Sequence, residues 1–88
     1  NLRLGTTIRK NRRAAEAGDA VAQLNLGDAY ARGLGVPADL VSAYVFLSLA
    51  AAQGRRWAES RRADVATAMS PTDVGAAEAR LAKWRAEH

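Results

Sequence analysis

The chain has 88 residues, no cysteine and a formal net charge of +4, and 49% of its residues are apolar. This length is typical of one small domain, and the lack of cysteine excludes disulfides and thiolate metal sites. The longest apolar run, residues 43–52, is interrupted by Ser48 and is far shorter than the roughly 20 residues of a membrane-spanning helix.

The first half of the chain predicts three helices. Residues 1–6 show little pattern, and a first helix is expected over residues 7–17, with Thr6 or Thr7 as its cap and Gly18 at its end. Apolar residues then recur at three- and four-residue steps over residues 20–32 and again over residues 39–53. These two stretches are expected to form helices that a glycine-rich bend joins.

The second half predicts two more helices. The fourth is expected over residues 56–69, with four residues available for packing: Trp57, Ala58, Val65 and Met69. Ser70 and Pro71 then mark a sharp helix start, because serine caps the free amides and proline suits the first helical position. The last helix carries an apolar stripe, which consists of Val74, Ala77, Leu81 and Trp84. No strand pattern is present, so we expect an all-α fold of about five antiparallel helices.

Gly27 lies in the middle of the second predicted helix, beside Leu26 and Tyr30. A mid-helix glycine costs about 1 kcal/mol relative to alanine. We therefore interpret Gly27 as a place where another helix comes too close for a side chain. Gly33 follows at the end of this helix, where a left-handed backbone favours glycine. Asp39 is placed to cap the next helix by accepting hydrogen bonds from its free amides.

A long motif runs through both of these helices. It reads Ala20-x-Ala22-Gln23-x-Asn25-Leu26-Gly27-x-x-Tyr30-x-x-Gly33-x-Gly35-Val36-x-x-Asp39-x-x-x-Ala43 and continues as Ala50-Ala51-x-Gln53-Gly54. This pattern resembles a Sel1-like repeat, a helix-turn-helix unit related to the tetratricopeptide repeat. Phe46 stands where that family usually has tryptophan. Because such units stack into a superhelix, the resemblance implies a fragment of an α-α solenoid.

The chain also matches itself at an offset of 36 residues, since Ala14, Ala15 and Gly18 correspond to Ala50, Ala51 and Gly54. A period of this length is typical of arrays of helical pairs. Residues 1–18 are therefore expected to be an N-terminal tail and the second helix of a preceding, partial repeat, so that the chain is a piece of a longer protein. Residues 19–54 are expected to form one complete Sel1-like repeat. Residues 55–88 are expected to form a degenerate two-helix C-terminal cap.

Repeat arrays of this kind bind partners on a surface lined mainly by the first helix of each pair. The resemblance thus implies a protein–protein interaction module, acting as an adaptor or regulatory scaffold in a bacterial signalling or cell-envelope complex. Both the cytoplasm and the periplasm suit such a role. The candidate partner-binding residues share one face of the second predicted helix: Asn25, Asp28, Ala29 and Arg32. An ordinary solvated face, with Asp28 and Arg32 paired, is the equally favoured alternative.

A basic accessory domain that binds nucleic acid or an anionic surface is a second hypothesis. Its candidate residues are Arg9, Arg12, Arg13, Arg55 and Arg56. No aromatic residue interleaves with the arginines of the first helix, so a platform for stacking bases is missing there. A solvated basic face is therefore favoured over a nucleic-acid site. Self-association through the apolar ends of the solenoid is a third hypothesis.

Residues 33–38 satisfy the pattern G-x-G-x-x-A, which binds dinucleotides when a strand precedes it and a helix opens within it. Here a predicted helix precedes the pattern and Pro37 interrupts it, so we interpret it as the turn of the repeat. His88, the only histidine, has no local partner of the kind that a catalytic base or metal ligand needs. The acids are scattered along the chain. We therefore expect a protein that is not an enzyme and holds no metal or cofactor.

Overall fold

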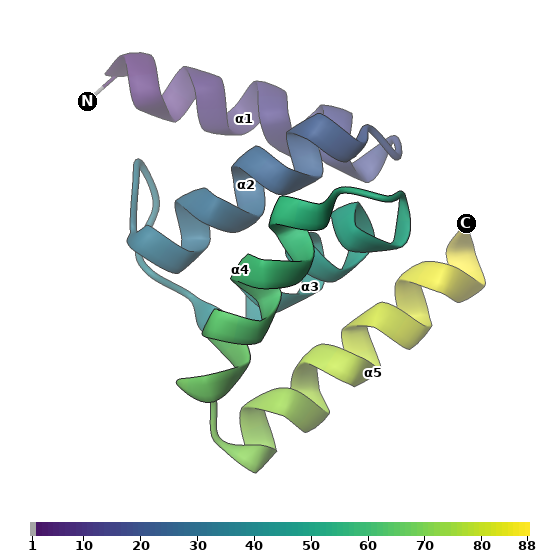
Figure 1. Cartoon of the computed structure of the whole chain (residues 1–88). Helices are drawn as coiled ribbons and strands as arrows, with labels where there is room; N and C mark the ends of the chain where they lie inside the picture. Colours follow the sequence, from purple (N-terminus) through teal and green to yellow (C-terminus); the bar gives the residue numbers. More distant parts are fainter. Residues whose placement is uncertain (1) are drawn as a thin grey trace.

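A computed structural model describes residues 2–88, with side chains from residue 7 onward. Within that part of the chain the fold is all-α, with five helices and no strand: α1 (Leu2–Glu16), α2 (Ala20–Arg32), α3 (Leu40–Ala52), α4 (Arg56–Thr67) and α5 (Pro71–Glu87). Successive helices run in alternating directions (Figure 1). The expected all-α class and the five antiparallel helices are confirmed.

Two helix boundaries differ from the expected ones. The first helix begins at Leu2 rather than at residue 7, so Thr6 and Thr7 lie inside it and do not cap it. No proline interrupts residues 2–7, and a single glycine there costs only about 1 kcal/mol. The fourth helix ends at Thr67 instead of Met69, because tighter three-residue turns at Ala68 and Met69 close it before Pro71.

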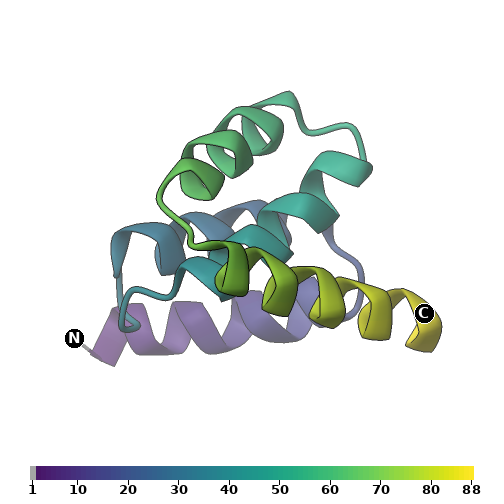
Figure 2. The same cartoon turned by 90° about the horizontal axis from the view of Figure 1, so that it is seen from below.

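Helix α3 is the centre of the molecule and is buried on nearly every side. One hydrophobic cluster joins α3 to α1, α2 and α5, and a second joins α3 to α4. In Figure 2, α4 lies on one side of the α2–α3 pair, while α1 and α5 lie on the other. An all-round apolar helix suits such a buried position, and buried residues run almost without a break from Ser42 to Ala50.

The closest helix contact is at Gly27 of α2. A Cβ atom built on Gly27 would lie 2.7 Å from Leu47 Cγ and 3.1 Å from the Leu47 backbone nitrogen on α3. Such distances leave no space for a side chain. The predicted close approach of a neighbouring helix at Gly27 is therefore confirmed, and α3 is the helix concerned.

The bend between α2 and α3 follows the expected chemistry. Gly33 ends α2 with a left-handed φ of 68°, and its amide donates to Ala29 O. Gly35 has a φ of 76°, which turns the chain again. Asp39 then caps α3 by accepting a 3.1 Å hydrogen bond from the Ser42 amide. A second link, from the Asp39 amide to Tyr30 O, holds the end of the bend against α2.

Helix α5 starts with a complete capping box. The Asp73 amide donates to Ser70 Oγ, while the Ser70 amide donates to the Asp73 carboxylate. From there α5 packs across α3 through Ala77 and Leu81, which are almost fully buried. Three members of the predicted apolar stripe, Ala77, Leu81 and Trp84, therefore form the contact, and Trp84 is partly buried.

Candidate functional site

Asp28 makes two ion pairs, and one of them links α2 to α4. Its carboxylate lies 3.3 Å from Arg32 Nη1, one turn along α2, and 3.0 Å from Arg61 Nη2 on α4. The Arg32 side chain is 59% exposed, whereas the Arg61 side chain is 30% exposed. The expected pairing of Asp28 with Arg32 is present. The link to Arg61 was not expected. Asp28 and Arg61 are 33 residues apart, and no spacing pattern in the sequence indicates that they meet.

Trp57 lies in solvent on the first turn of α4 and is 50% exposed. This contradicts the expected packing role of Trp57. The packed face of α4 carries Ala58 and Val65, both buried against α3. The Arg61 guanidinium covers the Trp57 ring at 5.3 Å from its centroid, a cation–π contact. Thus Arg61 holds Asp28 on one side and the indole of Trp57 on the other.

We use the name α2–α4 surface for five residues that lie on α2 and α4: Asn25, Asp28, Arg32, Trp57 and Arg61. Three of the four sequence-predicted binding residues belong to it. The fourth, Ala29, does not, because it is only 6% exposed and belongs to the hydrophobic cluster around α3. The error has a simple cause: Ala29 lies next to Asp28 in sequence but turns toward the core. Trp57 and Arg61 were not predicted to belong to this surface, because residues 55–88 were expected to form a C-terminal cap.

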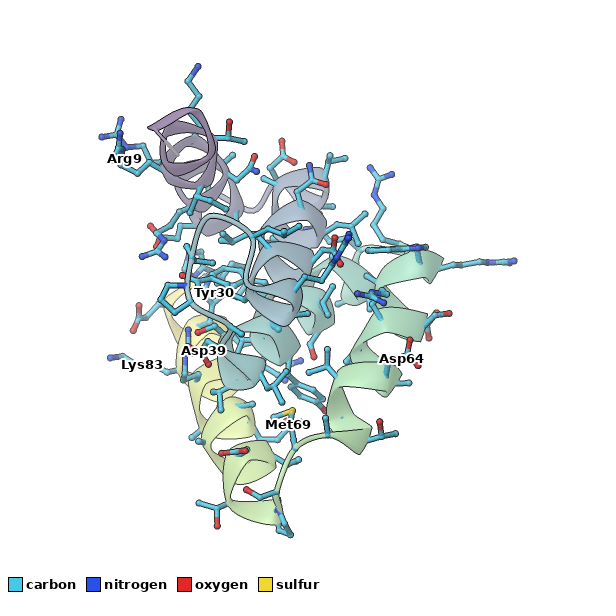
Figure 3. All side chains as sticks on the ribbon, turned by 90° about the vertical axis from the view of Figure 1, so that its left-hand side faces the viewer. Arg9, Tyr30, Asp39, Asp64, Met69 and Lys83 are labelled. Atoms are coloured by element: carbon cyan, nitrogen blue, oxygen red, sulfur yellow. The ribbon has the colours of Figure 1, made fainter. Side chains whose placement is uncertain are left out.

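The five arginines of the predicted basic patch do not form one cluster. Arg12 donates a hydrogen bond to Tyr30 Oη and lies 5.8 Å from the centre of that ring, toward the C-terminal end of α2. Arg55 and Arg56 instead begin α4. They closely follow Gln53, whose side chain donates to Gly18 O in the turn after α1. Arg9 extends from α1 on the side away from α4 (Figure 3).

A pair of glutamines ties the ends of three helices together. Gln23 is fully buried, and its Nε2 donates to Ala15 O at 3.1 Å. Gln53 Nε2 donates to Gln23 Oε1 at 2.9 Å and to Gly18 O at 2.8 Å. The turn after α1 is therefore bonded to the end of α3. This places the start of α4 beside the start of α2 and so fixes the α2–α4 surface.

The start of α3 is tied to α5 by a chain of polar groups. Arg80 Nη1 donates to Ser42 Oγ at 2.9 Å, and Ser42 Oγ donates to Asp39 Oδ2 at 2.8 Å. Burial raises the pKa of Asp39, but the hydrogen bonds from Ser42 and the charge of Arg80 outweigh it, so this pKa lies below its ordinary value. These bonds make Asp39 a structural residue.

Tyr44 provides a second polar link between α3 and α5. Tyr44 Oη donates to Glu78 Oε1 at 3.0 Å. Burial and this bond raise the pKa of Tyr44. In Figure 3, Met69 lies between α4 and α5, where it packs against the clusters on both sides of α3. The predicted packing role of Met69 is thus confirmed.

A hollow of about 360 Å³ lies beside the C-terminal end of α3. Its wall comes from the turn after α1, the end of α3 and the end of α5: Gly18, Leu49, Ala52, Gln53, Trp84 and Arg85. His88 stacks on Trp84 at 3.8 Å between ring centroids, and its ring nitrogens lie near Trp84 O and Glu16 O. His88 therefore contacts backbone carbonyls and an aromatic ring.

Residues 33–38 form a helix–helix turn between α2 and α3, so no strand precedes the glycine pattern. Over residues 2–88, no three His, Cys, Asp or Glu side chains gather in a geometry suited to a metal ion. No helix in that range has the length and apolarity to cross a membrane.

The residues of the long motif have clear structural positions in this molecule. Gly27 admits Leu47, Gly33 and Gly35 form the bend, and Tyr30 stacks on Phe46 at 6.1 Å. Six further positions of the motif lie in the helices or at their ends: Leu26, Asp39, Ala43, Ala50, Ala51 and Gly54. No family model matches the sequence, and a comparison with curated proteins finds no match.

Proposed function

We propose that the chain is a protein-interaction module of the Sel1-like type, which binds a partner polypeptide across the α2–α4 surface. The exposed position of Trp57 is the observation that carries this proposal. Tryptophan and arginine are enriched among the residues that dominate binding energy at protein interfaces. Trp57 has half of its surface in water, and Arg61 holds its ring in place. The side chain is therefore oriented before a partner arrives, which lowers the entropy cost of binding.

The arrangement of helices supports the same proposal. In arrays of helical pairs, the first helices of successive pairs lie side by side and form the binding surface. Under the 36-residue repeat, α2 and α4 are two such first helices, and the Asp28–Arg61 ion pair joins them. An adaptor or regulatory scaffold in a bacterial signalling or cell-envelope complex is the role that fits such a module. The alternative of a nucleic-acid-binding domain has less support, because Arg12 bonds Tyr30 of α2 while Arg55 and Arg56 lie at the start of α4.

Site-specific photo-cross-linking in cells tests this proposal. A photoreactive amino acid replaces Asn25 on the α2–α4 surface or, as a control, Ala79 on the exposed side of α5. We expect a discrete protein adduct from position 25 only, and we expect Trp57→Ala to remove it. Equal adducts from both positions, or adducts that Trp57→Ala leaves unchanged, would contradict the proposed surface. Adducts with nucleic acid alone would favour the alternative.

A further inference from the structure

The charge around Trp57 indicates which kind of polypeptide suits this surface. Arg55 and Arg56 directly precede Trp57, and both are exposed. Their side chains form no hydrogen bond or ion pair with any of residues 7–88 in the structure. Arg32 and Arg61 differ from them, because both are paired with Asp28. The unneutralised positive charge of Arg55 and Arg56 therefore lies at the start of α4, in the same turn as the exposed indole.

The charge of Arg61 is also only partly neutralised. Its Nη2 binds Asp28, but its Nε is buried and donates to no atom of residues 7–88. One carboxylate thus has to serve two guanidinium groups, which leaves a net positive charge around Asp28. An incoming acid near Trp57 would meet an excess of cationic groups over anionic ones, which favours its approach.

A polypeptide fits these features better than a nucleic acid does. Non-specific nucleic-acid sites stack successive bases on several aromatic side chains, and Trp57 is the sole aromatic residue of α4. A phosphate backbone also carries charge at every step, so it would pass the acids Asp28, Glu59 and Asp64 of α2 and α4. A peptide instead places a few carboxylates where the arginines lie. Figure 3 shows Asp64 on α4, directed outward.

We propose that the α2–α4 surface takes an acidic polypeptide segment in which carboxylates flank one aromatic or large aliphatic side chain. The apolar side chain packs on the open part of Trp57, and the carboxylates pair with Arg55 and Arg56. This inference rests on the proposed function, since it names the partner class for the same surface.

Peptide selection without prior choice of sequence tests this inference. A random dodecapeptide display library is selected on the immobilised wild-type chain, after removal of peptides that bind the Trp57→Ala variant. We expect the enriched peptides to have a net negative charge and a shared aromatic or large aliphatic position. Enrichment of neutral or basic peptides would overturn the acidic partner class while leaving the surface intact. No enrichment that depends on Trp57 would overturn the surface itself, and with it the proposed function.

A charge-reversal comparison then tests the two arginines with an enriched peptide made synthetically. Arg55→Glu/Arg56→Glu should weaken its binding by about tenfold or more, because two favourable charge contacts become repulsive. The matched control is Lys83→Glu/Arg85→Glu, which reverses two exposed charges on α5 and should change binding less than about twofold. Equal weakening by both variants would show only a general effect of net charge and would overturn the assignment to Arg55 and Arg56. Circular dichroism of both variants confirms that the helices remain.

Discussion

Helices α2 and α4 occupy matching positions 36 residues apart, but they contact the rest of the molecule differently. Helix α2 packs between α1 and α3 and buries five residues, one of them the polar Gln23. Helix α4 packs mainly on α3 and buries only Ala58 and Val65. Packing therefore restricts most of the residue types in α2. The residues of α4 are freer, and this is where the exposed tryptophan and the unpaired arginines lie.

The same difference is visible at single pairs of positions that lie 36 residues apart. Gly27 of α2 corresponds to Ala63 of α4, and Gly27 contacts Leu47 whereas Ala63 is exposed. Val21 corresponds to Trp57, and both are exposed, at 46% and 50%. The outward position is therefore common to the two helices, while the close contact belongs to α2 alone. Positions 36 residues apart therefore agree in exposure for one pair, Val21 and Trp57, and differ for the other, Gly27 and Ala63.

Gly27→Leu gives the largest expected loss of stability. The added side chain has no space against Leu47, so we expect a loss of about 3 kcal/mol in the free energy of unfolding. Ala63→Leu, at the matching position of α4, is the control and should change that free energy by less than about 0.5 kcal/mol. Urea denaturation of both variants gives the comparison. Similar losses for the two variants would show that α2 and α4 do not differ in packing.

Replacing each tryptophan by alanine should give the next largest difference in the free energy of unfolding. Trp84→Ala removes a ring that packs against the α3 cluster and lines the neighbouring hollow, and we expect it to cost about 2 kcal/mol. Trp57→Ala should cost less than about 0.5 kcal/mol, since Trp57 is half exposed. Thermal or urea unfolding measures both. A larger loss from Trp57→Ala would mean that α4 buries this residue in solution.

Gln23→Leu tests the polar contacts that only α2 has. This change keeps the approximate volume but leaves Ala15 O and Gln53 Nε2 without their shared partner, so we expect a loss of about 1 to 2 kcal/mol. Glu59, the matching residue of α4, is exposed, and Glu59→Leu should have an effect below about 0.5 kcal/mol. If chemical denaturation gives Gln23→Leu the wild-type stability, the glutamine pair is not what holds the helix ends together.

The starts of α3 and α4 predict a small difference in pH dependence. Asp39 caps α3, whereas Arg55 gives α4 no side-chain cap. Because the pKa of Asp39 is lowered in the folded state, its contribution is complete above the usual aspartate pKa of about 3.9 and is lost as the pH falls through the lower folded value. An asparagine at this position would still cap the helix without titrating. Asp39→Asn should therefore cost less than about 1 kcal/mol at pH 7.

The unfolding free energies of wild type and Asp39→Asn, measured between pH 7 and pH 2, check this prediction. The difference between the two proteins should shrink as Asp39 becomes protonated in acid. A constant difference over the whole range would show that Asp39 has the same pKa in the folded and unfolded states.

Much of the fold follows from local sequence rules. Gly27, the glycines of the bend and the capping residues Asp39 and Ser70 each have the structural part that helix and turn chemistry predicts. The surface was less predictable. Whether Ala29 or Trp57 is buried depends on which faces of their helices α3 covers, and the link from Asp28 to Arg61 joins residues that are distant in sequence. Periodicity identifies a helix face, but tertiary packing decides whether that face meets protein or water.

The exposure of Trp57, with and without a bound peptide, tests the central proposal most directly. In a Trp84→Phe background, Trp57 is the only tryptophan, so acrylamide quenching reports on its indole alone. We expect strong quenching in the free chain and clear protection when a selected acidic peptide is bound. An indole that is already protected in the free chain, or that stays equally quenched in the complex, would contradict the assignment of the α2–α4 surface as the binding site.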